Sequence, residues 1–164
     1  MYIHYGSDEF IPWTSIRNLR GFQKPEGGLW ASREGDPNGW EAWCQKEGFL
    51  LERLQKCFRF TLAEGSRVLT LENEDQLIDL PKQEPWKPKD LSWMEKLEPD
   101  QIPTREQLDE LYRPNWCVLD FEELRKKYDA IEMINAGAFL HSLNLWDCNS
   151  ILVMNADVVQ VMEP

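Results

Sequence analysis

The stretch FRFTLAEGSRVLTL, residues 58–71, decides the class of fold. Residues 58–62 alternate between apolar and polar side chains, which is the period-two pattern of a half-buried strand. Glu64-Gly65-Ser66 has the composition of a turn, and the apolar run 68–71 predicts a second strand. Short strands separated by turns are therefore the expected building blocks of this chain.

Further short strands are expected toward both ends of the sequence. They cover residues 1–5, 29–32, 128–133, 150–155 and 158–162. Connections long enough for repeated parallel βαβ units are scarce between them. The sequence therefore predicts an α+β fold around a mostly antiparallel, split sheet with short helices.

Short helices are expected over residues 40–48, 75–80, 104–112 and 120–127. In the first of these, Trp40 and Trp43 are three residues apart and share one helical face. Two helices begin with the spacing of a capping box, namely Thr104 with Gln107 and Asp120 with Glu123.

Residues 81–103 differ in character from the rest of the chain. They contain many charges, five prolines and two tryptophans, Trp86 and Trp93. Proline fixes φ and removes a hydrogen-bond donor, so this density opposes long helices and strand ladders. We expect an irregular insertion that lies over the body, anchored by the two tryptophans, within a single domain spanning residues 1–164.

The charge balance limits the partners that the chain can bind. It has 29 acidic and 18 basic side chains, for a formal net charge of −11. A field of this sign repels duplex DNA and anionic lipid, so we expect neither as a direct partner. No apolar run approaches the ~20 residues of a membrane span. Residues 1–10 are neither basic nor continuously apolar, so no secretory leader is expected.

The cysteines and histidines give no metal-site pattern. The four cysteines lack CxxC spacing, and two histidines are too few for a histidine-rich site. Free thiols in a reducing compartment explain such a set most simply. We therefore expect a cytoplasmic protein with no metal.

Eight tryptophans are unusual for this length, and several lie beside glycine or charge rather than in apolar runs. Trp30 follows Gly27-Gly28, and flat rings from neighbouring elements can sandwich a planar ligand. His4 stands just before a Gly-Ser turn, where a ligand can approach the backbone closely. The alternative for each residue is structural: a strand histidine bonded to backbone, and tryptophans packed in the core.

Four segments carry a resemblance to a known family. They are His4-Tyr5-Gly6-Ser7, Gly28-Leu29-Trp30-Ala31-Ser32, Tyr128-Asp129-Ala130-Ile131 and Ser150-Ile151-Leu152-Val153-Met154-Asn155-Ala156, with Trp40 or Trp43 after the second. In their order and spacing they resemble the ADP-ribosyltransferase fold of diphtheria-type toxins and poly(ADP-ribose) polymerases, including its phage and bacterial members.

The resemblance implies NAD as substrate and a set of residues that would bind it. These residues are His4, Gly6, Trp30, Ser32, Trp40 and Trp43. The histidine would hydrogen-bond the adenosine ribose, and the glycine would let NAD approach the backbone. The aromatic rings would flank the nicotinamide, with the serine on the same wall.

The family's catalytic glutamate has no direct counterpart. Its position corresponds to Ser150, or to Asn149 if the register slips by one residue. The role requires negative charge, because the transition state is a cationic sugar. The nearby acids are Asp147, just before the strand, and Glu132 on the preceding strand.

Three readings of function follow. The first is an NAD-dependent ADP-ribosyltransferase that modifies a protein or nucleic-acid acceptor and releases nicotinamide. The second is a non-catalytic relative that binds a nucleotide or inhibits a partner protein, which the missing glutamate and the charge of −11 favour. The third is an unrelated α+β binding protein, which full burial of Trp30 and Trp43 without a cleft between them would favour.

Overall fold

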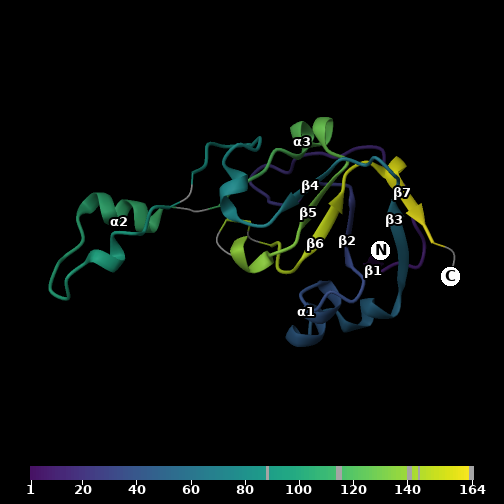
Figure 1. Cartoon of the computed structure of the whole chain (residues 1–164), viewed down its shortest axis with the longest axis horizontal. Helices are drawn as coiled ribbons and strands as arrows, with labels where there is room; N and C mark the ends of the chain where they lie inside the picture. Colours follow the sequence, from purple (N-terminus) through teal and green to yellow (C-terminus); the bar gives the residue numbers. More distant parts are fainter. Residues whose placement is uncertain (88, 114–115, 140–141, 144, 163–164) are drawn as a thin grey trace.

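The computed structural model describes residues 1–87, 89–113, 116–139, 142–143 and 145–162. In this part of the chain seven strands form one mixed sheet, in the order β4-β5-β6-β2-β1-β3-β7 (Figure 1). The strands are β1 (Tyr2–Tyr5), β2 (Leu29–Arg33), β3 (Cys57–Leu62), β4 (Val68–Leu71), β5 (Ala130–Met133), β6 (Ser150–Val153) and β7 (Val159–Val161). β4 and β5 run parallel, and the other neighbouring pairs are antiparallel. The fold is α+β.

The sheet is continuous but narrows between β1 and β2. Two residue pairs join these strands, Tyr2 with Arg33 and Ile3 with Ser32, whereas β1 pairs with β3 along its whole length. After these two pairs the backbone pairing of β1 with β2 ends, and a side-chain hydrogen bond joins the strands instead. The Nδ1 atom of His4 lies 2.7 Å from the carbonyl oxygen of Trp30. The sheet is therefore not split as expected, and its narrowest junction is bridged by a histidine.

The two strands of residues 58–71 form, but they are not partners. β4 lies at one edge of the sheet and pairs with β5, while β3 lies between β1 and β7 near the other edge. The backbone explains this separation: the N–H of Asp129 donates to the carbonyl oxygen of Arg67, which directs residues 68–71 toward β5. A turn-like sequence between two strands therefore did not produce a hairpin.

Three α-helices lie outside the sheet: α1 (Trp40–Glu47), α2 (Arg105–Tyr112) and α3 (Phe121–Lys127). α1 ends at Gly48, whose φ of 65° suits glycine. α2 begins with the expected capping box. At α3, Asp120 accepts from the N–H of Glu123, whose carboxylate pairs instead with Lys126. The 3-10 turns are η1 (Leu51–Gln55), η2 (Glu74–Leu77), η3 (Met94–Lys96), η4 (Ala136–Phe139) and η5 (Ala156–Val158).

Two hydrophobic clusters stabilise the sheet. The larger contains Phe121 and Leu124 of α3 together with the buried residues Ile131 and Met133 of β5. The smaller is built around β3 and the inner strands and includes Phe60, which is fully buried. Side chains alternate across a strand, so the central strands supply both clusters.

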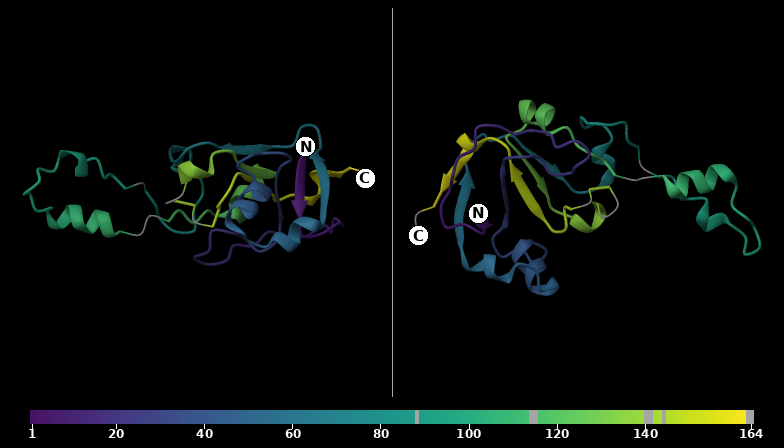
Figure 2. Two further views of the ribbon diagram at one scale, coloured as in Figure 1. Left: turned by 90° about the horizontal axis from the view of Figure 1, so that it is seen from below. Right: turned by 180° about the vertical axis from the view of Figure 1, so that it is seen from behind.

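The proline-rich segment does not lie over the body as a whole. Its first part stays on the sheet side, where Trp86 packs against the larger cluster and the N–H of Gln83 donates to the carbonyl oxygen of Val118. Residues 89–113, which we call the arm, project away from the sheet in all three views (Figures 1 and 2). Trp93 therefore lies in the arm and does not anchor the segment to the body. Within 81–103, η3 is the regular element among the described residues.

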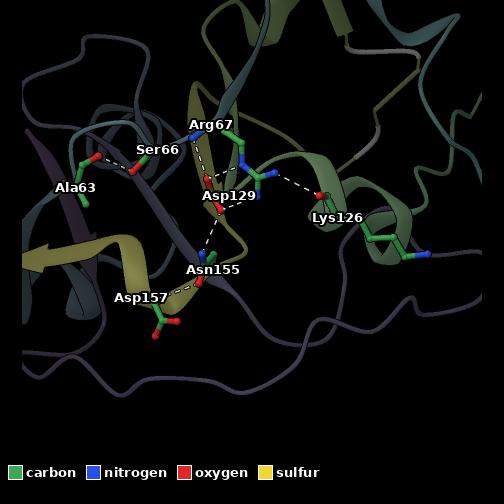
Figure 3. Close-up of polar contacts among 7 residues, drawn as sticks. All are labelled: Ala63, Ser66, Arg67, Lys126, Asp129, Asn155 and Asp157. Atoms are coloured by element: carbon green, nitrogen blue, oxygen red, sulfur yellow. Dashed lines mark hydrogen bonds and ion pairs between the residues drawn. The ribbon is translucent and has the colours of Figure 1, made fainter.

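A polar clamp holds the start of β4, the start of β5 and the end of β6 together (Figure 3). The Arg67 guanidinium donates to both carboxylate oxygens of Asp129, at 3.1 and 3.0 Å, and Asn155 Nδ2 donates to the same carboxylate at 3.1 Å. The hydrogen bonds from Arg67 hold the pKa of Asp129 well below its usual range. Asp129, which lies in one of the four segments that carry the family resemblance, therefore stabilises the sheet.

Candidate functional site

A cavity of about 280 Å³ lies beside the β1–β2 junction. Its lining comes from β1, from residues 24–32 at the start of β2, from α1 and η1, and from residues 145–150 before β6. The residues singled out from the sequence that line it are His4, Trp30, Ser32, Trp40, Asp147 and Ser150. Segments from the two ends of the chain thus meet in one site.

His4 is half-buried at the cavity and bonded to the backbone across the junction. A carbonyl oxygen only accepts, so Nδ1 donates to Trp30 and the neutral ring keeps Nε2 as an acceptor. The ring also contacts Phe58, with centroids 5.1 Å apart. This arrangement fixes the imidazole, and no described residue bonds Nε2. The bond from Nδ1 agrees with a structural role for His4, and Nε2 remains available to a ligand.

Two tryptophans form an aromatic corner. The rings of Trp30 and Trp146 meet edge to face, with centroids 4.8 Å apart. Trp146 is only 2 % exposed, and its indole N–H donates to the carbonyl oxygen of Gln23 at 2.9 Å. Trp30 is half-buried and carries the ammonium of Lys24 over its ring, 4.9 Å from the centroid. Trp146 therefore holds Trp30 in place, and Trp30 presents its surface to the cavity.

Ser32 connects three parts of the site through its hydroxyl. The Oγ donates to the carbonyl oxygen of Asn149 at 2.9 Å and accepts from the N–H of Trp40 at 2.9 Å. These bonds tie β2 to the beginning of α1 and to the segment before β6. The serine is 2 % exposed, so its main effect is to position Trp40 and residues 147–150.

The segment before β6 carries the acid of the cavity. Leu145 has a φ of 74°, a left-handed conformation that is unfavourable for a leucine. Asp147 is exposed, whereas Cys148 next to it is buried, and burial raises the pKa of that thiol to about 12. The cysteine is therefore a protonated packing residue at ordinary pH. Asp147 provides the carboxylate among the described lining residues.

Two predicted binding residues lie outside this lining. Gly6 has a φ of 105° and donates its N–H to the carbonyl oxygen of Lys56, so its role here is to form the turn after β1. Trp43 stacks on Trp40, with centroids 5.3 Å apart, but lines a separate cavity of about 330 Å³. Of the two candidate second aromatic residues, the structure brings Trp40 to the cavity.

Glu132 does not reach the cavity. In the register of β5 and β6, Met133 lies opposite Ser150 and Glu132 lies opposite Ile151. Opposed residues share a face, so Glu132 points to the other side of the sheet from Ser150. There the carboxylate is bound by Arg33, with Nε to Oε1 at 2.7 Å and Nη2 to Oε2 at 2.8 Å. Glu132 therefore lies away from this cavity, where Asp147 is the acid that the structure brings to the lining.

Among the lining residues that sequence reasoning missed are Lys24, Arg53 and Trp146. Lys24 lies in the loop before β2, and Arg53 lies in η1, where no pattern distinguishes a ligand-binding cation from a solvated one. Trp146 follows a segment with no clear period. The unusual tryptophan content was the only signal that pointed toward it.

No protein-family model, curated protein or solved structure matches this chain. Among the described residues, no helix is long and apolar enough to cross a membrane. The same part of the chain has no group of three or more side chains placed to hold a metal ion. Any function must therefore be argued from the cavity itself.

Proposed function

We propose that the protein binds NAD in the cavity beside the β1–β2 junction and acts as an ADP-ribosyltransferase. The proposal is carried by the meeting of His4, Trp30 and residues 145–150 in one cavity, although they come from opposite ends of the chain. Trp30 and Trp43 are only half-buried, and each lines a cavity, which disfavours a purely structural role for them.

The lining suits the nicotinamide half of NAD. Trp30 and Trp40 provide flat apolar surfaces, and ring stacking is worth about 0.5–1.5 kcal/mol beyond area burial. In this placement Nε2 of His4 would accept a hydrogen bond from the nicotinamide ribose, and not from the adenosine ribose that the resemblance implies. A volume of about 280 Å³ is near the lower limit of small-molecule sites, which begin at roughly 300 Å³. We expect the cavity to enclose one nucleoside and the rest of NAD to extend over its rim.

Asp147 is the residue that would support transfer. In the reaction the bond between ribose C1 and the nicotinamide nitrogen breaks, and its electron pair leaves with nicotinamide. The acceptor nucleophile then bonds C1 and loses its proton. The sugar is cationic between these events, so a carboxylate beside it lowers the barrier. Ser150 is uncharged and cannot supply this charge.

A second candidate function is nucleotide binding without transfer. It is favoured by the serine at the glutamate position and by the turning of Glu132 to the other face of the sheet. In that case the same cavity would bind a nucleotide, and the acidic chain would act on a partner protein.

Labelled NAD separates these functions. The protein is incubated with it, with and without cell extract, as parent, Asp147→Asn and the control Asp157→Asn, which alters an exposed aspartate of η5. We expect nicotinamide release and labelling of an acceptor by the parent and the control, and a loss on the order of 10²–10³ in rate for Asp147→Asn with NAD binding kept. Binding without turnover by the parent would support the second function, and absence of NAD binding would overturn the first.

A further inference from the structure

Two cations of the cavity form no close ion pair with a described residue, although Asp147 lines the same cavity. Lys24 and Arg53 line it, and neither forms an ion pair or a hydrogen bond through its side chain with a described residue. Several other arginines form close ion pairs with carboxylates, at 2.7 Å for Arg33 with Glu132 and 2.6 Å for Arg59 with Glu34. The chain carries a net charge of −11, yet neither of these two cations at one cavity has the carboxylate of a described residue bound to it.

The environment of Lys24 makes this lack of a partner costly. Its ammonium lies over the Trp30 ring, and the residue is half-buried. Burial lowers the pKa of Lys24, while the more distant Asp147 acts in the opposite direction. A partly desolvated cation is stabilised when an anion approaches it, because a charge-assisted hydrogen bond replaces the lost hydration.

The two cations lie on opposite sides of the β1–β2 junction. Lys24 stands over Trp30 of β2. Arg53 packs beside the turn after β1, since a Cβ atom added at Gly6 would lie 3.8 Å from Arg53 Cδ. The His4 side chain that bridges the strands lines the same cavity. An anionic group placed across the junction would therefore have a cation on each side.

We propose that Lys24 and Arg53 bind the phosphate groups of the ligand, and that the cavity selects ligands carrying a pyrophosphate over nucleosides that carry no phosphate. This inference rests on the proposed function for the location of the ligand, and it adds the ligand class and two residues that the sequence did not indicate. Lysine binds phosphate as a point charge and arginine as a planar fork, so the pair suits a group with several oxygens.

The test measures binding by calorimetry for four probes: NAD, nicotinamide riboside, ADP and inorganic pyrophosphate. The variants are Lys24→Met, which keeps the apolar stem over Trp30, and Arg53→Gln. The matched control is Lys56→Gln, an exposed lysine next to η1 that is not in the lining. Circular dichroism establishes that each variant is folded.

We expect each cavity variant to weaken NAD and ADP binding about tenfold or more, because hydrogen bonds to charged groups are worth about 1.5–3 kcal/mol and 1.4 kcal/mol is tenfold. Riboside binding should not weaken, because the riboside has no phosphate and is itself a cation, and the control should match the parent. Equal binding of riboside and NAD, unaffected by either variant, would overturn the phosphate site and leave the proposed function standing. Pyrophosphate binding that both variants weaken, without NAD binding, would support the anion site and overturn the NAD function. No binding of any probe would overturn both.

Discussion

The sheet and the arm differ in what holds them together. The sheet places fully buried side chains such as Phe60 and Leu152 between its strands and their covering elements. Within the arm, residues 89–113, no residue is buried, and Ile102 and Tyr112 are 84 % and 79 % exposed. The arm is held by polar contacts instead, including Lys89 Nζ to the carbonyl oxygen of Leu111 at 2.7 Å. Regular structure in this protein therefore has two sources, and only one of them is a hydrophobic core.

The largest difference in stability should appear when a buried apolar side chain of the sheet and an exposed one of the arm are each truncated to alanine. We expect Phe60→Ala to lower the free energy of unfolding by about 3–5 kcal/mol, because it leaves a cavity between Tyr2 and Phe58. Ile102→Ala in the arm should change it by less than about 0.5 kcal/mol. Urea denaturation followed by circular dichroism measures both. Equal losses would mean that the arm has a core of its own.

The polar clamp of the sheet should make stability depend on acid. The pKa of Asp129 is held below its usual range, so its contribution is present above the unfolded pKa of about 3.9 and is lost as pH falls below that value. We expect Asp129→Asn to cost about 1.5–3 kcal/mol at pH 7, because the hydrogen bonds from Arg67 and Asn155 lose a charged acceptor. The variant should also lose less stability than the parent between pH 5 and pH 2.

Thermal unfolding at a series of pH values tests the clamp. Asp157→Asn is the control, because that exposed carboxylate is not part of the clamp. The control should keep the acid loss of the parent. A parent and an Asp129→Asn variant with parallel pH profiles would show that the clamp does not contribute in this way.

A smaller effect is expected from the helix cap in the arm. Thr104 accepts from the N–H of Gln107 at the start of α2, and loss of such a cap typically costs about 1 kcal/mol. In Thr104→Ala this cost should fall on α2 alone, with faster hydrogen exchange of its amides and unchanged exchange in β2 and β6. Thr104→Ser keeps the cap and should behave as the parent. Faster exchange in the sheet would show that the arm and body unfold together.

The smallest effect should come from removing the arm. Its ends are close, since Arg113 Nη1 donates to the carbonyl oxygen of Lys87 at 2.9 Å, so a short Gly-Ser linker can replace residues 89–113. Because this segment buries no residue, the unfolding midpoint of the body should remain nearly that of the parent. Differential scanning calorimetry measures it. A large drop in the midpoint would place the arm among the elements that stabilise the body.

The local elements of the fold were predictable because their signals are local. Alternation marked residues 58–62 as a strand, Gly48 ended α1 with its left-handed φ, and the Thr104 capping box began α2. Strand pairing was not predictable in the same way. β3 and β4 are neighbours in the sequence but lie near opposite edges of the sheet, because β4 takes β5 as its parallel partner.

The candidate site shows the same division. Residues picked out by position in strands and turns, such as His4, Trp30 and Asp147, meet at one cavity. Lys24 and Arg53 were missed, because an isolated cation in a loop or a 3-10 turn has no pattern of its own. The sequence did not distinguish between Asp147 and Glu132, because both acids lie near the position expected for the catalytic glutamate.

The sequence by itself determined the short strands, the approximate bounds of the three α-helices, the acidic charge and the concentration of tryptophan, since each depends on residues within one turn or one strand. Residues 75–80, expected as a helix, form only the 3-10 turn η2 (Glu74–Leu77). Only the tertiary structure decided which residues of the chain meet. The register that sets Met133 opposite Ser150 turns Glu132 away from the cavity and toward Arg33. A shift of one residue in that pairing would reverse the two faces, and pairing between distant strands depends on contacts that no local pattern contains.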